Sequence, residues 1–242
     1  MDFLKNQIHI NLDVGEGIVD ETKMFSKVSA VNIACGGHAG DDFTISSSIN
    51  FALENQNQIG LHPSYQDREN FGRLSLQLPL DELIDQWYGQ YELFIKNLNR
   101  ENATLNHIKP HGALYNDLLH NQNLAKAFVQ SLSFFSQPLI VYTMYGSALH
   151  KEAKAAHFEV QFEAFLDRSY LSSLKLTPRS MMGAVLEEPT EVLTQLSELN
   201  RNKGLYSLTD AWIPINAQTY CLHSDHSNTL AILNYLHRNF RP

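Results

Sequence analysis

Features that would place this chain in a membrane or among disulfide-rich proteins are nearly absent. Its 242 residues contain no apolar run near the ~20 residues that a membrane-spanning helix needs. The only cysteines, Cys35 and Cys221, cannot form a disulfide framework and suit a reducing compartment. After residues 1–7, Asn11 and Asp13 interrupt the apolar segment too early for a secretory signal. We therefore expect a soluble, cytoplasmic protein.

Basic runs and the common nucleotide-binding and nucleophile motifs are also missing. The formal net charge of −8 argues against nucleic acid or an anionic membrane as a partner. The sequence has neither a Gly-x-x-x-x-Gly-Lys-Ser/Thr phosphate loop nor a Gly-x-Gly-x-x-Gly fingerprint, and it has no Gly-x-Ser-x-Gly elbow. These absences argue against a nucleotide-hydrolysing site of the usual kinds and leave small polar molecules as substrates.

Several apolar runs rich in β-forming residues end in clusters of titratable residues. Two further strand candidates, 138–143 and 204–208, lack such ends. Segments with helical periodicity separate the runs, the clearest of them at 79–99. The runs with charged ends cover 8–13, 31–35, 59–63, 107–112, 162–168 and 220–225, and the other expected helices cover 42–55, 123–133, 147–156, 189–200 and 227–239.

Strands that alternate with helices predict parallel pairing and an α/β fold. A closed β/α barrel and an open doubly wound sheet both place sites at the carboxyl ends of strands. Clusters over the whole length favour the barrel, because a closed ring brings every strand end to one rim. We expect one domain over residues 1–242, a seven- or eight-stranded barrel, with the aperiodic segment 163–183 as a long functional loop over the rim.

Two glycine-rich turns carry candidate functional residues. Asp13 and Glu16 flank a glycine, so both carboxylates could face a substrate amine or a metal; alternatively, Asp13 caps a helix and Glu16 is solvated. His38 lies among three glycines, which let the backbone approach a bound group closely. Of Asp41 and Asp42, we expect one to be the N-cap of the next helix and the other to orient His38.

Cationic and imidazole side chains supply further candidates. Lys109 and His111 follow a strand, where a lysine can polarise a carbonyl or neutralise an oxyanion and a histidine can shuttle protons. Arg68 and Arg73 follow His62 in a charged loop. Each arginine could clamp a carboxylate or a phosphate, or could form a surface ion pair with a neighbouring acid.

The same set of residues could hold a divalent metal. Asp13, His38, His62, His111 and His223 have the donor types of a Zn²⁺ site, and three of them would suffice for a catalytic ion. They come from separate strands rather than from one helix, so their spacing does not decide whether a metal binds.

In their order along the chain, these clusters resemble the LamB/YcsF family, which is identified with the A subunit of prokaryotic 5-oxoprolinase. The resemblance covers nearly the full chain. It implies an irregular β/α barrel of the polysaccharide-deacetylase type and ATP-dependent opening of 5-oxo-L-proline to L-glutamate with companion subunits B and C. The segments that carry it are 11–17, 32–41, 62–64, 67–68, 71–73, 109–116, 165–170, 178–179 and 221–225.

The resemblance and the clusters together suggest an amide hydrolase. Lys109 and an arginine such as Arg179 would hold a carboxylate or the lactam oxygen. His111 or His38, oriented by Asp13 or Asp41, would activate water. ATP would be consumed by or with the companion subunits, and a divalent metal is left open. The catalytic candidates are Asp13, His38, Lys109 and His111, and the substrate-binding candidates are Glu16, His62, Arg68, Asp167, Arg168, Arg179 and His223.

Two alternative functions stay open. A metal-dependent deacetylase or amidohydrolase would act alone, with bound Zn²⁺ and without ATP. A non-catalytic subunit would only deliver or shape the site of its companions. The number of strand-end histidines argues against such a scaffold, which has no need to gather titratable groups.

Overall fold

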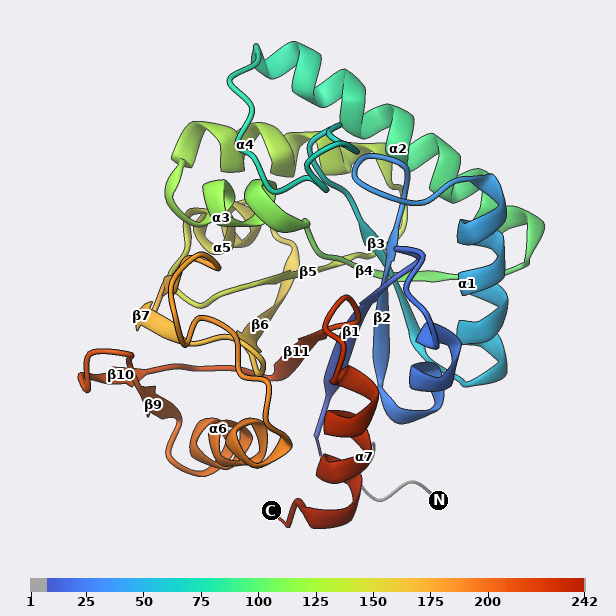
Figure 1. Cartoon of the computed structure of the whole chain (residues 1–242). Coiled ribbons are helices and arrows are strands. Elements are labelled where there is room, and N and C mark those ends of the chain that lie inside the picture. Colours follow the sequence, from blue (N-terminus) through green and yellow to red (C-terminus); the bar gives the residue numbers. More distant parts are fainter. Residues whose placement is uncertain (1–7, 242) are drawn as a thin grey trace.

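The computed structural model describes residues 8–241. Within this range, seven parallel strands form a closed barrel (Figure 1). Around the ring the strands follow the order of the chain, and the last strand pairs with both the sixth and the first. The predicted fold class is therefore confirmed. The barrel strands are β1 (Ile10–Val14), β2 (Ala30–Ala34), β3 (Gln58–His62), β4 (Leu105–Ile108), β5 (Ile140–Thr143), β6 (Glu159–Phe165) and β11 (Thr219–His223).

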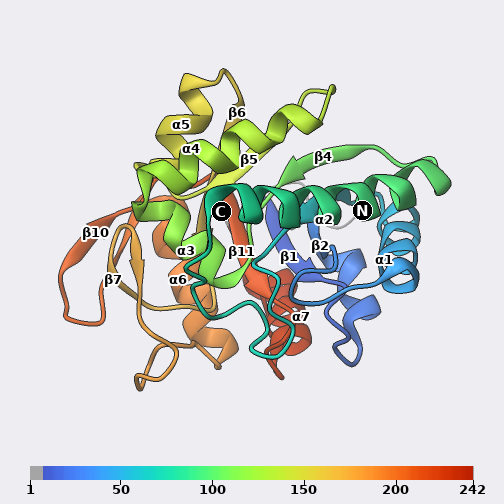
Figure 2. The ribbon, with the colours of Figure 1, turned by 90° about the horizontal axis from the view of Figure 1, so that it is seen from above.

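Six helices that the periodicity predicts are present, with ends within two residues of the predicted ones. They are α1 (Asp42–Glu54), α2 (Leu80–Arg100), α4 (Gln122–Ser131), α5 (Ala148–Ala155), α6 (Pro189–Arg201) and α7 (Thr229–Asn239). The long α2 buries Trp87, Tyr91 and Phe94 on one face and packs against α1 and α4 outside the barrel (Figure 2). Helices thus cover the outer, apolar surface of the ring.

Other elements do not follow from the periodicity. A further helix, α3 (Gly112–His120), begins directly after His111, and two 3₁₀ segments, η1 (Glu21–Lys27) and η2 (Leu132–Phe134), join other elements. A glycine in a sequence is typical of a turn, and Gly112 does have a positive φ of 55°. The helix nevertheless starts at this residue. Because this glycine follows Lys109 and His111, the local sequence does not indicate the start of α3.

The strand predicted at 204–208 does not belong to the barrel. Its β9 (Gly204–Tyr206) pairs antiparallel with β10 (Trp212–Pro214) in a separate ribbon. Because β6 and β11 pair directly, the ring has no place for another strand. The segment 163–183, predicted as a long loop, begins within β6 and contains an antiparallel hairpin of β7 (Tyr170–Ser172) and β8 (Lys175–Leu176).

Side chains of the barrel strands alternate between the helices and the barrel interior. In β1, the aliphatic residues at positions 10, 12 and 14 belong to the hydrophobic core. Asn11 and Asp13 point the other way, where Asn32 of β2 donates to both of them at 2.7 Å. The interior of the ring is therefore a hydrogen-bonded polar network, and this network leads to the strand ends.

Residues 1–7, on which the prediction of no secretory signal rests, lie outside the described residues. Among the helices of residues 8–241, none combines the length and the apolar character needed to cross a bilayer. The cytoplasmic location stays a prediction.

Asp41 and Asp42 take separate roles at the start of α1. The Asp41 side chain accepts from the Thr44 backbone N–H at 2.8 Å, and the Thr44 hydroxyl accepts from the Asp41 N–H at 2.7 Å, which forms a capping box. Asp42 pairs with Lys96 and Arg100 of α2. The prediction that one of the two is the N-cap is confirmed, and the other orients no histidine.

We expect Asp41→Ala to destabilise the protein by about 1 kcal/mol, because the backbone N–H and the hydroxyl of Thr44 both lose the Asp41 carboxylate as acceptor. Urea denaturation measures the change in the free energy of unfolding. Asp41→Asn retains the capping oxygen and should restore most of this loss. Equal stability of the Asp41→Ala variant and the original chain would contradict the assignment.

Candidate active site at the carboxyl ends of the strands

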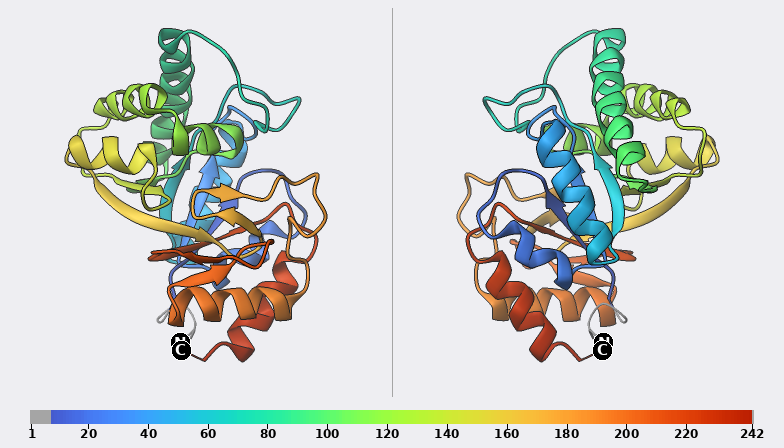
Figure 3. Two further views of the ribbon diagram at one scale, coloured as in Figure 1. Left: turned by 90° about the vertical axis from the view of Figure 1, so that its left-hand side faces the viewer. Right: turned by 90° about the vertical axis from the view of Figure 1, so that its right-hand side faces the viewer.

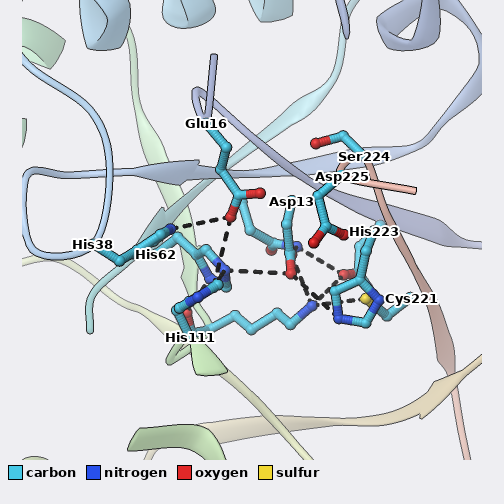
Figure 4. A network of polar contacts seen from close by, with 12 residues as sticks. Asp13, Glu16, His38, His62, His111, Cys221, His223, Ser224 and Asp225 are labelled. Carbon is cyan, nitrogen blue, oxygen red and sulfur yellow. Dashed lines mark hydrogen bonds and ion pairs between the residues drawn. The ribbon is translucent and has the colours of Figure 1, made fainter. Parts of the chain in front are cut away.

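The charged strand ends meet at one rim of the barrel. Figure 4 shows carboxylates and imidazoles that point toward one another around Asp13. They come from β1, β3 and β11 and from the loops after β1, β2, β4 and β6. The cluster consists of Asp13, Glu16, His38, His62, Lys109, His111, Asp167 and His223.

The ammonium group of Lys109 lies inside the barrel and is surrounded by acceptors. It donates to Asp13 Oδ1 at 2.8 Å and to Cys221 Sγ at 2.9 Å, with Glu163 Oε1 at 3.1 Å and Asn11 Oδ1 at 3.2 Å. Burial alone would lower the pKa of Lys109, but the charge of Asp13 raises it well above its ordinary value. Since an ammonium has three N–H donors, none is left over for a substrate carboxylate. The geometry therefore does not support the predicted role of Lys109 in holding the substrate.

Asp13 links this lysine to the histidines. Its Oδ1 accepts from Lys109 and Asn32, and its Oδ2 lies 3.3 Å from His62 Nε2 and 3.9 Å from His223 Nε2. Burial would raise the pKa of Asp13, but the charges of His62 and Lys109 lower it well below its ordinary value. Asp13 is a buried carboxylate, and it caps no helix, because Asp20 occupies the N-cap position of η1.

Three imidazole rings pack together beside Asp13. The rings of His38 and His111 stack, with 3.6 Å between centroids and 3° between planes, and His62 meets both edge-on. His62 Nε2 lies 3.0 Å from His111 Nδ1. Burial lowers the pKa of His38 to about 3 and that of His111 well below its ordinary value, so both of these rings are neutral near pH 7.

Glu16 closes the cluster on the side of His38. Its Oε1 accepts from His38 Nε2 at 3.0 Å and lies 3.6 Å from His111 Nδ1. Its side chain is only 2% exposed, so Glu16 is not the solvated residue of the alternative interpretation. Burial, together with the charge of Asp13, raises the pKa of Glu16 to about 7.

Two glycines allow the loop after β3 to pack onto these rings. Gly72 has φ +61°, and a Cβ there would lie 2.9 Å from the Cβ of His38. Gly112 has φ +55°, and its Cβ would lie 2.5 Å from the Gly72 carbonyl oxygen. The Ala113 N–H donates to that same oxygen at 2.9 Å. Larger residues at either glycine would push the loop away from the site.

Asp167 and His223 form a second carboxylate and histidine pair. His223 Nδ1 donates to Asp167 Oδ2 at 2.9 Å, and the His223 backbone N–H donates to the same oxygen at 3.0 Å. Burial opposes the charged forms of both groups. Their mutual attraction outweighs it, raising the pKa of His223 and lowering that of Asp167. The pair fixes the imidazole so that its Nε2 is turned toward Asp13.

A cavity of about 480 Å³ opens onto the cluster. The segments that follow β1, β3, β4, β6 and β11 surround it, and Figure 3 shows the loops after β1, β3 and β6 gathered on one side of the barrel. Arg73 and Arg179 lie on its wall beside Asp225, with which Arg73 forms an ion pair. Cationic groups and titratable groups therefore share one cavity.

The predicted site residues take different positions relative to this cavity. His38, His62 and Asp167 lie behind its wall as hydrogen-bond partners of residues that line it. Arg68 is not part of the wall and donates to the Gly40 carbonyl, and Arg168 is buried and donates to backbone carbonyls near β8. Arg168 nevertheless lines the cavity, whereas Arg68 does not. The predicted site residues that line the cavity are Asp13, Glu16, Lys109, His111, Arg168, Arg179 and His223.

Four residues that contribute to the site lie within the strand-end runs but are not among the predicted site residues: Asn11, Asn32, Glu163 and Asp225. The first three lie within strands, on the side that faces the interior. Counting back by two residues along β1 from Asp13 would have found Asn11. No comparable signal exists for Glu163, because an apolar residue, Phe165, follows it on the same side of β6.

Two groups of side chains within residues 8–241 have metal-ligand types and suitable proximity. One consists of Glu16, His38, His62 and His111, and the other of Asp13, Cys221 and His223. In the second group, the Lys109 ammonium already lies within 3 Å of both Asp13 and Cys221. A metal cation held between Asp13 Oδ1 and Cys221 would meet this positive charge, so the second group does not take one as a set. The other Asp13 oxygen, Oδ2, is not bonded to Lys109 and lies 3.3 Å from His62 Nε2 of the first group.

The fold and the site define a β/α-barrel protein with a buried carboxylate and histidine centre at the carboxyl ends of its strands. The sequence matches the LamB/YcsF family over residues 8–241, and the chain belongs to this family. It is similar to the crystal structure of a lactam utilization protein from Thermus thermophilus, with 28% identity, 96% of this chain and 94% of the other covered, and a TM-score of 0.87.

A more distant structural match has the same fold. It is a protein from Enterococcus faecalis described as a putative cellobiose-phosphate cleavage protein, with 12% identity, 89% of this chain and 79% of the other covered, and a TM-score of 0.51. This likeness concerns the barrel alone.

We expect Lys109→Met to destabilise the protein by about 3–5 kcal/mol, because the buried carboxylates of Asp13 and Glu163 lose their cation. Urea denaturation measures this loss. Lys151→Met on α5 is the matched control, since Lys151 is exposed, and its stability should change little. A loss below about 1 kcal/mol for Lys109→Met would mean that the ion pairs of Lys109 with Asp13 and Glu163 do not stabilise the fold.

Proposed function

We propose that this chain hydrolyses the lactam ring of 5-oxo-L-proline to L-glutamate, as the A subunit of an ATP-dependent 5-oxoprolinase that works with companion subunits B and C. Membership in the LamB/YcsF family and the similarity to a lactam utilization protein support a cyclic amide as substrate. A cavity of about 480 Å³ is large enough for a small ring compound.

The observation that carries this proposal is the Asp167 and His223 pair at the cavity. Amide hydrolysis requires a group that takes a proton from water and a group that gives a proton to the departing nitrogen. Because His223 Nδ1 donates to Asp167, its Nε2 is the nitrogen available for both transfers. Neutral His223 takes the proton as water attacks the carbonyl carbon, and the imidazolium returns it to the ring nitrogen as the C–N bond breaks.

The remaining residues of the cavity have supporting roles in this scheme. Arg73 and Arg179 can receive the carboxylate of the substrate in place of Asp225, with which they now interact. Lys109 does not contact the substrate and instead keeps Asp13 ionised and fixed. His223 thus takes over the proton transfer that the sequence hypothesis gave to His111 or His38.

A γ-lactam is a resonance-stabilised amide, so its hydrolysis needs activation. The sequence of this chain has no phosphate loop, which supports placing the nucleotide chemistry on the companion subunits. The two other candidate functions, a stand-alone amidohydrolase and a non-catalytic subunit, predict different behaviour in the two experiments that follow.

The first experiment combines the purified chain with its companion subunits, ATP and 5-oxo-L-proline. We expect glutamate to form at a steady rate, and omission of ATP, of this chain or of the companions to abolish it. A coupled glutamate assay measures the rate. ATP-independent turnover of N-acetyl compounds by the chain alone, without lactam cleavage by the complex, would instead identify an amidohydrolase.

In the second experiment, we expect His223→Gln to lower kcat by roughly 10²–10⁴-fold in the assembled complex, because the proton-transfer group is lost. His150→Gln on α5, outside the cavity, should leave kcat unchanged. Circular dichroism and co-purification confirm folding and assembly of each variant. Unchanged turnover of His223→Gln would favour the non-catalytic subunit.

A further inference from the structure

The contact between His62 and His111 is unusual because the other nitrogen of each ring faces a backbone carbonyl oxygen. His62 Nδ1 lies 2.7 Å from the Lys109 carbonyl oxygen, and His111 Nε2 lies 3.0 Å from the Phe71 carbonyl oxygen. A carbonyl can only accept, so both of these nitrogens must carry hydrogen. In two neutral rings, His62 Nε2 and His111 Nδ1 are then both lone-pair acceptors, and they face each other at 3.0 Å.

Two lone pairs at this distance repel each other unless a positive charge lies between them. A carboxylate lies beside each of the two nitrogens: Asp13 Oδ2 is 3.3 Å from His62 Nε2, and Glu16 Oε1 is 3.6 Å from His111 Nδ1. Donors about 2.1 Å from one Zn²⁺ ion are separated by about 3.4 Å in a tetrahedral site and about 3.0 Å in an octahedral one. The three separations, 3.0, 3.3 and 3.6 Å, are close to these values.

Each of the four donors is also held by a second partner. The two histidines donate to backbone carbonyls, which is how metal-bound histidines are usually oriented. Asp13 is fixed by Asn32 and Lys109, and Glu16 is fixed by His38. The donors are therefore oriented before any ion arrives. Asp13, Glu16 and His111 also line the cavity, which gives an ion a path to them.

His38 is excluded from this donor set by its orientation. Its ring is parallel to that of His111, with 3.6 Å between the centroids. The lone pairs of an imidazole lie in the plane of the ring, so two stacked rings cannot direct them at one ion. His38 instead orients Glu16, and Glu16 takes the place that the sequence hypothesis gave to His38.

We propose that Asp13, Glu16, His62 and His111 bind one divalent transition-metal ion of the Zn²⁺ type. Two nitrogen and two oxygen donors suit such an ion better than Ca²⁺ or Mg²⁺, which prefer oxygen alone. A metal here would polarise a carbonyl oxygen and lower the pKa of a bound water. The inference goes beyond the proposed function, because binding is measured without substrate or companion subunits and stands or falls independently of lactam cleavage.

The test uses Co²⁺ as the probe, with the full chain first treated with a chelator. Equilibrium dialysis and visible absorption should show one bound Co²⁺ per chain with d–d bands of nitrogen and oxygen ligation. We expect His62→Ala, His111→Ala and the isosteric Glu16→Gln each to weaken Co²⁺ binding at least tenfold. His38→Gln should weaken it less than these and keep the one-to-one stoichiometry. His150→Gln is the control and should bind as the original chain does.

Circular dichroism shows whether each variant is folded, and Glu16→Gln, which keeps size and shape, covers the case in which a histidine variant unfolds. If the folded original chain binds no Co²⁺, a proton alone bridges the two histidines and the proposal fails. It also fails if the folded variants bind Co²⁺ as tightly as the original chain. A thiolate-to-cobalt band in the near ultraviolet would place the ion at Cys221 instead and likewise overturn the assignment.

Discussion

The ion pair between Lys109 and Asp13 inside the barrel is the interaction on which the rest of the structure depends. An ammonium and a carboxylate removed from water cost several kcal/mol each unless every donor and lone pair finds a partner. Here the partners come from across the ring, as Asn11, Asn32, Glu163 and Cys221. They come from β1, β2, β6 and β11, and the pairing of β11 with both β1 and β6 brings these strands together around the ion pair.

This interior network leads to the rim, where the loops of the site lie. Strand alternation sends apolar side chains outward and polar ones inward, and the last inward residue of each strand reaches the rim. Buried Glu21 then joins two rim loops, since it accepts from the Gly15 backbone N–H at 2.8 Å and from the Ser224 hydroxyl at 3.2 Å. The loops around the cavity are thereby tied to a rigid base, as a preorganised site requires.

The sequence predicts the parts of this arrangement that depend on local spacing. The helical periodicity of α2 predicts its length and its buried face, and strand-end clusters predict that Asp13, Lys109 and His223 approach one another. It cannot predict what those side chains do there. Lys109 has no free N–H because Glu163 and Cys221 also contact its ammonium group. These two residues come from strands far away in the chain, and nothing in their local sequence indicates that both contact the same lysine. The strand at 204–208 has the local pattern of a barrel strand, but β6 and β11 pair with each other and β9 pairs with β10 instead.

Asp13 has two oxygens, and they face two different environments. Oδ1 accepts from Lys109 and Asn32 in the interior, whereas Oδ2 faces His62 and His223 at the cavity. A cation drawn to Oδ2 therefore acts on a carboxylate whose position is already fixed through Oδ1, and it needs no reorganisation of Asp13. The same carboxylate that neutralises the buried lysine thus supplies negative charge to the site, which explains why a charged lysine without substrate contact belongs in an active centre.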